Sequence, residues 1–321
     1  MKPQSFHLVA RGDLELLECR RFARIPWLRH AFSTRGLHPK HGPGAKRGAG
    51  FNSATAGLNL GLGEDDRRSR TETKRRLFLD CLEVGARAVA SLRQIHSSVV
   101  HYAWTEGPGD VRYTPPGCSP AQAASDGPPC GDALLTDQPG LFLSVSTADC
   151  VPLLLLDPEC RAIAAVHAGW RGSLERIAEK TVGEMRRAFQ SQPEELLAAI
   201  GPSIRSCCYE VGPEIVEAFC GRFTRWEGYF KEPPPADGSR ALAPQYPLLF
   251  LSVRPPGHAP KGVAAAHLDL VAVTRDQLQN AGLRSANIHV ADNCTACRTD
   301  LFFSHRREGK TSRMMAVIGM V

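Results

Sequence analysis

Three apolar runs of strand length follow one another in the middle of the chain, and they constrain its fold more than any other feature. They span Leu141–Thr147, Val151–Leu156 and Arg161–Val166, with only a few residues between one run and the next. Short continuous apolar runs of this length are typical of β-strands. We therefore predict three consecutive strands, the last of which ends at His167.

Helical patterns alternate with these and further strand patterns. Ser173 begins the stretch SLERIAEKTVGEMRRAF, for which we predict a helix with Ser173 as its N-cap and apolar residues at helical spacing. A proline in the first turn predicts a short helix over Pro213–Cys220. We also predict a helix over His267–Ala281 and strands over Ile288–Val290 and Met314–Val321. Strands and helices mixed within one core indicate a single α+β or α/β domain over residues 1–321.

Three stretches rich in glycine and proline interrupt this pattern, near 38–57, 105–131 and 232–262. The first also carries two lysines, Lys40 and Lys46. Such composition cannot bury a core, so we predict that all three are loop insertions in the domain.

Charge and cysteine usage narrow the classes of function. The 39 Lys and Arg against 33 Asp and Glu give a net charge of +6, and the basic residues are spread out. The sequence therefore fits a small anionic substrate, and we expect no nucleic-acid partner.

No apolar run approaches the ~20 residues of a membrane helix, and the N-terminus lacks the pattern of a signal peptide. Eleven irregularly spaced cysteines suit free thiols in a reducing cytoplasm. The oligomeric state stays open.

Three chemically distinctive residues stand at the ends of apolar segments: His96, Cys150 and His167. Two imidazoles and one thiolate satisfy three positions of tetrahedral zinc and leave a fourth for water or substrate, as in a catalytic site. The neighbouring Asp149 could orient a histidine or move protons. A cysteine or histidine after a strand is also commonly a packed core residue. The spacing alone leaves both interpretations open.

Short motifs in a characteristic order carry a resemblance to a known family, from about residue 30 to the C-terminus. They are Phe32–Arg35, Leu58–Gly61, Gln94–His96, Gly131–Thr136, Thr147–Pro152, His167–Gly172, Ile200–Pro202, Cys208–Gly212, His267–Leu270 and Phe303–Arg307. The chain resembles the YfiH family, also labelled multicopper polyphenol oxidoreductase (laccase). The segments TADCVP and HAGWRG are the most specific of these motifs.

The resemblance implies a layered α/β/β/α domain, with zinc on His96, Cys150 and His167. It also implies a purine nucleoside phosphorylase that acts on adenosine, inosine and methylthioadenosine, and that deaminates adenosine. Phosphorolysis needs a phosphate held beside the sugar, and arginines bind phosphate in a bidentate manner. The candidates for this contact are Arg35, Arg171, Arg298 and Arg306, with the first two favoured by their positions in motifs.

Two other functions use the same residues. In the first, the site binds copper and oxidises polyphenols. Copper outranks zinc in affinity for such ligands, but the eleven histidines contain no His-x-His pair of the kind that a multicopper laccase needs. In the second, Cys150 is a nucleophile with His167 as its base in an amide-hydrolysing site, and the resemblance implies peptidoglycan precursors as the substrates. The fold of the family resembles that of a deamidating toxin domain, which suits this alternative.

Overall fold

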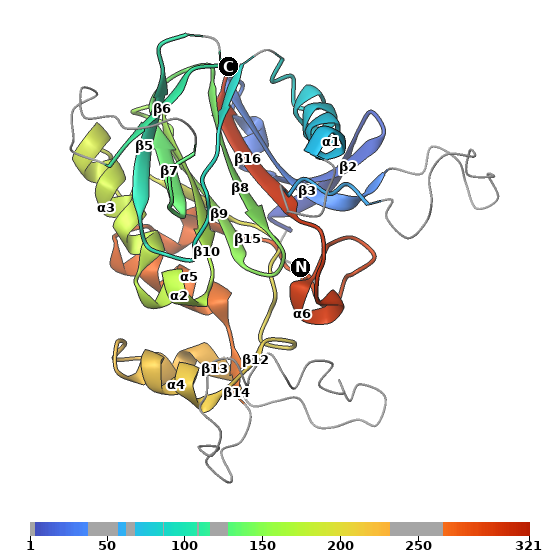
Figure 1. The fold of residues 1–321 in the computed structure, drawn as a ribbon. Helices are drawn as coiled ribbons and strands as arrows, with labels where there is room; N and C mark the ends of the chain where they lie inside the picture. Colours follow the sequence, from blue (N-terminus) through green and yellow to red (C-terminus); the bar gives the residue numbers. More distant parts are fainter. Residues whose placement is uncertain are drawn as a thin grey trace, which may run out of the picture. The chain divides into compact units, whose positions relative to one another are not determined.

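Two mixed β-sheets organise most of the chain in the computed structural model, which describes residues 4–37, 57–61, 68–85, 87–107, 109–115, 128–231 and 266–321 (Figure 1). These residues belong to two compact units, one of 1–205 with 270–321 and one of 206–269. Single-domain organisation over 1–321 stays a prediction. The expected insertions at 38–57 and 232–262 lie outside the described residues, apart from Gly57.

The first sheet of the larger unit has the strand order β1-β2-β3-β16-β8-β4. Its strands are β1 Phe6–Arg11, β2 Leu14–Cys19, β3 Leu28–Leu37, β4 Ala88–Ala90, β8 Leu141–Thr147 and β16 Met314–Met320. The second sheet has the order β15-β11-β9-β10-β7-β5-β6. Its strands are β5 Val100–Thr105, β6 Val111–Thr114, β7 Ala133–Thr136, β9 Val151–Asp157, β10 Ala162–Ala168, β11 Leu197–Ile200 and β15 Ile288–Val290.

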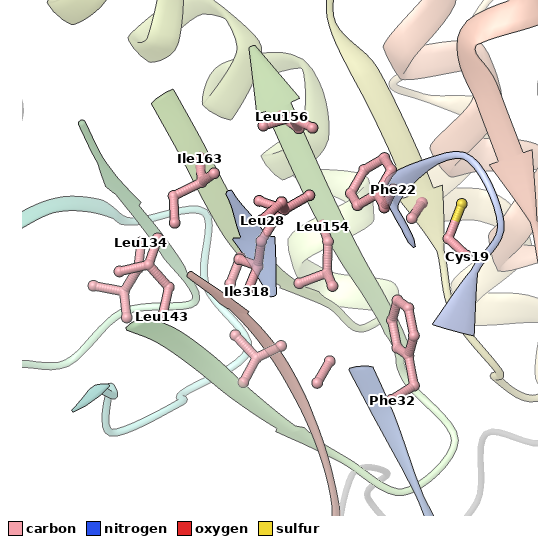
Figure 2. Close-up of a cluster of buried hydrophobic side chains, with 14 of the residues drawn as sticks. Cys19, Phe22, Leu28, Phe32, Leu134, Leu143, Leu154, Leu156, Ile163 and Ile318 are labelled. Carbon is pink, nitrogen blue, oxygen red and sulfur yellow. The ribbon is translucent and has the colours of Figure 1, made fainter. Parts of the chain in front are cut away.

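Strand β16 shows how the first sheet divides two cores. Successive side chains of a strand point to opposite faces. Ile318 therefore packs in one cluster with Leu154 and Ile163 of the second sheet (Figure 2). Val317 points the other way and packs in a separate cluster with Phe78 of helix α1, Arg68–Asp80. The first sheet thus lies between α1 and the second sheet.

Helices cover the outer face of the second sheet. Helix α3, Ile177–Phe189, contacts β5, β7 and β10, and it also packs against α2, Trp170–Leu174, and α5, Leu270–Asn280. The layers are therefore helix, sheet, sheet and helices (Figure 1). This arrangement confirms the predicted α+β fold with α/β/β/α layers.

The single helix predicted from Ser173 is wrong. The chain forms two helices, α2 and α3, separated at Arg176, whose backbone is left-handed with φ 61°. Helix α2 begins directly after β10, with Gly169 as its N-cap, so that Ser173 lies inside it. Gly172 permits this early start, because a Cβ there would lie 2.8 Å from the carbonyl oxygen of Ser97.

Two further expectations need correction. The helix predicted from His267 begins only at Leu270, because Ala266–Leu268 forms strand β14 instead. The stretch 105–131 is not all loop, because β6 pairs in antiparallel fashion with β5 within it. The predicted strands over Leu141–Thr147 and Ile288–Val290 form with those bounds.

The smaller unit is a three-stranded sheet with one helix. Its strands are β12 Glu210–Val211, β14 Ala266–Leu268 and β13 Phe230–Lys231, in that order. Helix α4, Pro213–Cys220, forms as predicted, with the proline in its first turn. Phe219 of α4 stacks on Phe223, with 5.4 Å between ring centroids.

The remaining elements are short. They are the 3-10 turns Phe22–Arg24, Trp226–Tyr229 and Ser285–Asn287, and helix α6, His305–Glu308. Within the described part of the chain, no helix combines the length and apolarity needed to cross a membrane.

Substitution by alanine is expected to have opposite effects on stability at two glycines, Gly319 and Gly183. A Cβ at Gly319 in β16 would lie 2.2 Å from the ring of the buried Phe142, whereas a Cβ at Gly183 in α3 would meet no atom within 4 Å. We expect Gly319→Ala to lower the free energy of unfolding by about 1–3 kcal/mol through overpacking. Gly183→Ala should raise it by about 0.5–1 kcal/mol, because alanine favours the helix. Urea unfolding of both variants measures this, and equal effects would contradict the described packing.

Candidate metal centre

The β9–β10 hairpin brings Cys150 and His167 together. His167 lies opposite Pro152 and Ala168 lies opposite Val151 in the antiparallel register. Cys150 precedes β9 and Gly169 follows β10, so these two residues meet where the strands end. A Cβ on Gly169 would lie 3.1 Å from Cys150 Sγ and 2.8 Å from His96 Cδ2. Only glycine leaves room for this close approach.

His96 reaches the same place from the loop before β5. Its backbone is left-handed, with φ 59°, a conformation that non-glycine residues adopt rarely. The Gln94 side chain anchors the loop to the end of β8. It accepts a hydrogen bond from the N–H of Ser146 (2.7 Å) and donates one to the Ser146 carbonyl (2.8 Å).

The three predicted ligands therefore converge. One side-chain donor atom each from His96, Cys150 and His167 lies within 4.8 Å of the others. The Sγ of Cys150 is 3.9 Å from His96 Nε2. Zinc bond lengths of roughly 2.0–2.3 Å at a tetrahedral angle place such a sulfur and nitrogen about 3.6 Å apart. His167 is buried and His96 is exposed, so the cluster opens to solvent on one side. These residues fit a single metal ion.

Asp132, directly before β7, orients His167. Its Oδ1 lies 2.8 Å from His167 Nδ1, and its backbone carbonyl accepts the His167 N–H at 2.8 Å. With Nδ1 engaged by a carboxylate, the ring presents Nε2 as its other donor atom. The carboxylate hydrogen-bonded to His167 is therefore Asp132, whereas the sequence suggested Asp149 for such a role.

Asp149 instead holds the C-terminal segment. Its Oδ1 accepts the hydroxyl of Thr295 at 2.5 Å, and its Oδ2 accepts the backbone N–H of Arg306 at 2.6 Å. Burial raises the pKa of Asp149, although these hydrogen bonds and one from Ser304 oppose the shift. Both carboxylate oxygens are thus engaged beside Cys150.

The four arginines proposed for phosphate divide into two pairs. Arg35 Nη1 donates to the carbonyl of Thr299 (2.6 Å) and pairs with Glu308 (2.7 Å). Arg298 forms two 2.8 Å hydrogen bonds with the carboxylate of Asp300. A phosphate would compete with these carboxylates.

The other pair is placed differently. Arg171 is exposed, and its guanidinium lies 4.4 Å from the ring centroid of Trp170. Arg306 is also exposed, and its backbone is fixed by Asp149, the residue before Cys150.

Opposite charges stabilise each other in the metal-free cluster. Burial by itself would raise the pKa of Cys150, but the charge of His167 and hydrogen bonds from both histidines outweigh it and lower the pKa to about 6. Burial would likewise lower the pKa of His167, but the Cys150 thiolate and Asp132 raise it to about 9. The cluster thus favours the thiolate, which is the form that binds metals and acts as a nucleophile.

The sequence analysis missed the role of Asp132. This residue entered only as part of the motif Gly131–Thr136. The available signal was a carboxylate at the start of a short apolar run, since polar residues at strand ends gather into sites. The sequence pattern did not show that β7 pairs with β10, with Ala133 opposite Val166.

A family model and several known proteins are similar to this chain. A family model described as multi-copper polyphenol oxidoreductase laccase matches residues 40–321. Purine nucleoside phosphorylase YlmD from Geobacillus stearothermophilus is 31% identical over 299 residues, which cover 91% of this chain and 94% of that protein. Adenosine deaminase RL5, from an unknown prokaryotic organism, is 38% identical over 181 residues, or 56% of this chain and 58% of that protein. The crystal structure of the hypothetical protein YfiH from Bacillus licheniformis superposes with a TM-score of 0.72 at 26% identity, covering 98% of this chain and 99% of that one.

The lowered pKa of Cys150 predicts its reactivity in metal-stripped protein. We expect iodoacetamide to alkylate Cys150 half-maximally near pH 6, because the thiolate fraction rises as the pH rises through its pKa. Cys160 serves as a control in the same sample, since slight burial and the carboxylate of Asp157 raise its pKa. Peptide mass spectrometry after alkylation between about pH 5 and pH 9 measures both residues. A common pH curve for the two peptides would contradict the described electrostatics.

Proposed function

Since the chain belongs to the multi-copper polyphenol oxidoreductase laccase family, in which similar proteins are named purine nucleoside phosphorylase and adenosine deaminase, we propose that it is a zinc-dependent enzyme of purine nucleosides. The proposed reactions are phosphorolysis of adenosine, inosine and methylthioadenosine, and deamination of adenosine. The metal ligands that we propose are His96, Cys150 and His167.

One observation carries the metal assignment. Donor atoms of the three residues converge within 4.8 Å, while the Nδ1 of His167 is taken up by Asp132. A metal-binding histidine almost always gives its second nitrogen to a carboxylate, a carbonyl or water in this way. Zinc held there by three protein ligands would supply Lewis-acid activation at its fourth position. We propose a reducing cytoplasm as the compartment, because Cys150 must stay a free thiolate to bind.

Positioning of phosphate falls to arginines that stand next to the proposed metal ligands. We propose Arg171 and Arg306 as the first candidates and Arg35 and Arg298 as the weaker ones. Arg171 stands four residues after His167, on the helix that starts where β10 ends. Arg306 is tied through its backbone to Asp149. Both are therefore anchored next to metal ligands while their side chains reach solvent.

Asp149 acts in this proposal by holding the segment that carries Arg306 beside Cys150. Its carboxylate accepts hydrogen bonds on both oxygens, which suits a fixed support. Direct transfer of protons by Asp149 would require one of these bonds to open.

A second candidate function is supported by one observation. Cys150, His167 and Asp132 stand in the order nucleophile, base and orienting carboxylate, with 2.8 Å between His167 Nδ1 and Asp132 Oδ1. Cysteine hydrolases use this arrangement. An amide hydrolase acting on peptidoglycan precursors therefore remains the alternative proposal.

The reaction is tested by chromatography of purified protein with adenosine, with and without phosphate. Phosphorolysis gives adenine and ribose 1-phosphate only when phosphate is present, whereas deamination gives inosine and ammonia in both cases. We expect both products. We also expect a chelator to abolish both and added zinc to restore them, because the ligands come from this one cluster.

Three results would contradict the proposal. The absence of adenine and inosine would reject the nucleoside substrates. An activity that survives the chelator but is lost with iodoacetamide would favour the cysteine hydrolase. Stoichiometric copper in protein made without added copper, together with turnover of phenols, would favour the oxidase.

The ranking of arginines predicts a separate effect. We expect Arg171→Ala to raise the KM for phosphate about 10- to 100-fold, because it removes a charge-assisted hydrogen bond to the anion. The KM for adenosine should change much less. Arg298→Ala is the matched control, since its guanidinium pairs with Asp300. Steady-state kinetics with phosphate varied at fixed adenosine measures this, and a larger effect of Arg298→Ala would reverse the ranking.

A further inference from the structure

One buried carboxylate receives hydrogen bonds from both histidine-bearing segments of the metal centre. Asp132 is fully buried. Its Oδ1 accepts from His167 Nδ1 (2.8 Å) and from the backbone N–H of His96 (3.1 Å). Its Oδ2 accepts from the N–H (2.6 Å) and the hydroxyl (2.7 Å) of Ser97, and from the N–H of Ile95 (3.3 Å).

We propose that Asp132 is the positioning residue that brings His96 and His167 into register as metal ligands. This inference rests on the proposed function, because it assigns a role toward the proposed zinc. The inference extends that proposal, because it names one side chain that positions His167 on β10 and His96 on its loop relative to each other.

The loop around His96 depends on this carboxylate. Consecutive N–H groups of Ile95, His96 and Ser97 all point at Asp132. Successive N–H groups around a left-handed residue form a concave anion-binding turn. His96 is that residue, with φ 59°. A backbone conformation of this kind persists only where the surroundings hold it, and Asp132 supplies the acceptor.

An asparagine at position 132 can accept hydrogen bonds at only one of the two places that Oδ1 and Oδ2 of Asp132 occupy. Its amide has one acceptor oxygen and one donating nitrogen. If the nitrogen replaces Oδ2, it opposes the N–H groups of Ser97 and Ile95. If it replaces Oδ1, it opposes the N–H of His96 and the Nδ1–H of His167. The first orientation loosens the loop on either side of His96, and the second removes the support of both histidines.

Asp157 provides a matched control for the general effect of a buried aspartate. It is also buried and accepts two backbone N–H groups, from Glu159 (2.9 Å) and Cys160 (3.0 Å). Asp157 is the last residue of β9, whereas Cys150 lies directly before the first residue of that strand. Asp157→Asn therefore removes the charge of a buried aspartate at the opposite end of the same strand, while its amide oxygen can still accept both hydrogen bonds.

The test is the zinc affinity of purified protein, measured by competition with a chromophoric chelator and read without any substrate. We expect Asp132→Asn to weaken zinc binding about 10- to 100-fold, the usual effect of losing a carboxylate behind a histidine ligand. Ser97→Ala removes only one hydroxyl donor and should weaken it about two- to tenfold. Asp157→Asn should leave the affinity within about twofold of wild type, whatever it does to unfolding of the metal-free protein.

The outcomes separate this inference from the proposed function. Wild-type protein that binds no zinc overturns both. Wild-type protein that binds zinc while Asp132→Asn binds it equally well overturns the positioning role alone. An equal loss in Asp157→Asn and Asp132→Asn also overturns it, because the effect would then be general destabilisation. If Asp132→Asn does not fold, Ser97→Ala decides, and an unchanged affinity overturns the inference.

Discussion

The pairing of β10 with β9 on one side and β7 on the other fixes which side chains meet at the candidate metal centre. Side chains alternate along a strand, so His167 shares a face with Ile163, which packs between the two sheets. A slip of one residue would turn His167 to the opposite face and bury the wrong set of side chains. The same register places Cys150 beside Gly169 and Asp132 beside His167. The strand register that builds the apolar core therefore also brings the polar residues of the site together.

That geometry requires a charged group in the interior. Burial of an unpaired carboxylate is costly, and Asp132 has no exposed surface. Hydrogen bonds from His167 and Ser97 compensate, and they hold the pKa of Asp132 below its usual value although burial alone would raise it. The dependence is mutual: the carboxylate needs these donors in order to be buried, and the donors take their positions from the carboxylate. The histidine on the strand and the histidine on the loop are in this way linked through one side chain.

The sequence predicted those parts of the molecule that depend on local pattern. Continuous apolar runs located β8 and β9, and residue chemistry and motifs picked out the three proposed ligands, whose donor atoms the structure brings within 4.8 Å. The errors have a common physical cause. The start of α2 directly after β10 depends on the close approach of Gly172 to Ser97, and β14 follows from pairing with β12 and β13. Asp132 was overlooked because its role comes from strand pairing. Each depends on contacts between distant segments, which a periodic pattern does not contain.

The position of His96 favours the metal over the thiol nucleophile. A cysteine hydrolase would be complete with Cys150, His167 and Asp132, and nothing in its chemistry calls for a second imidazole 3.9 Å from the sulfur. Yet His96 is held there in a left-handed conformation, with its loop fastened by Asp132 and by Gln94, and Gly169 leaves the space that it occupies. Strained backbone of this kind tends to mark functional sites. A third metal ligand accounts for this strain, whereas the triad leaves it without a purpose.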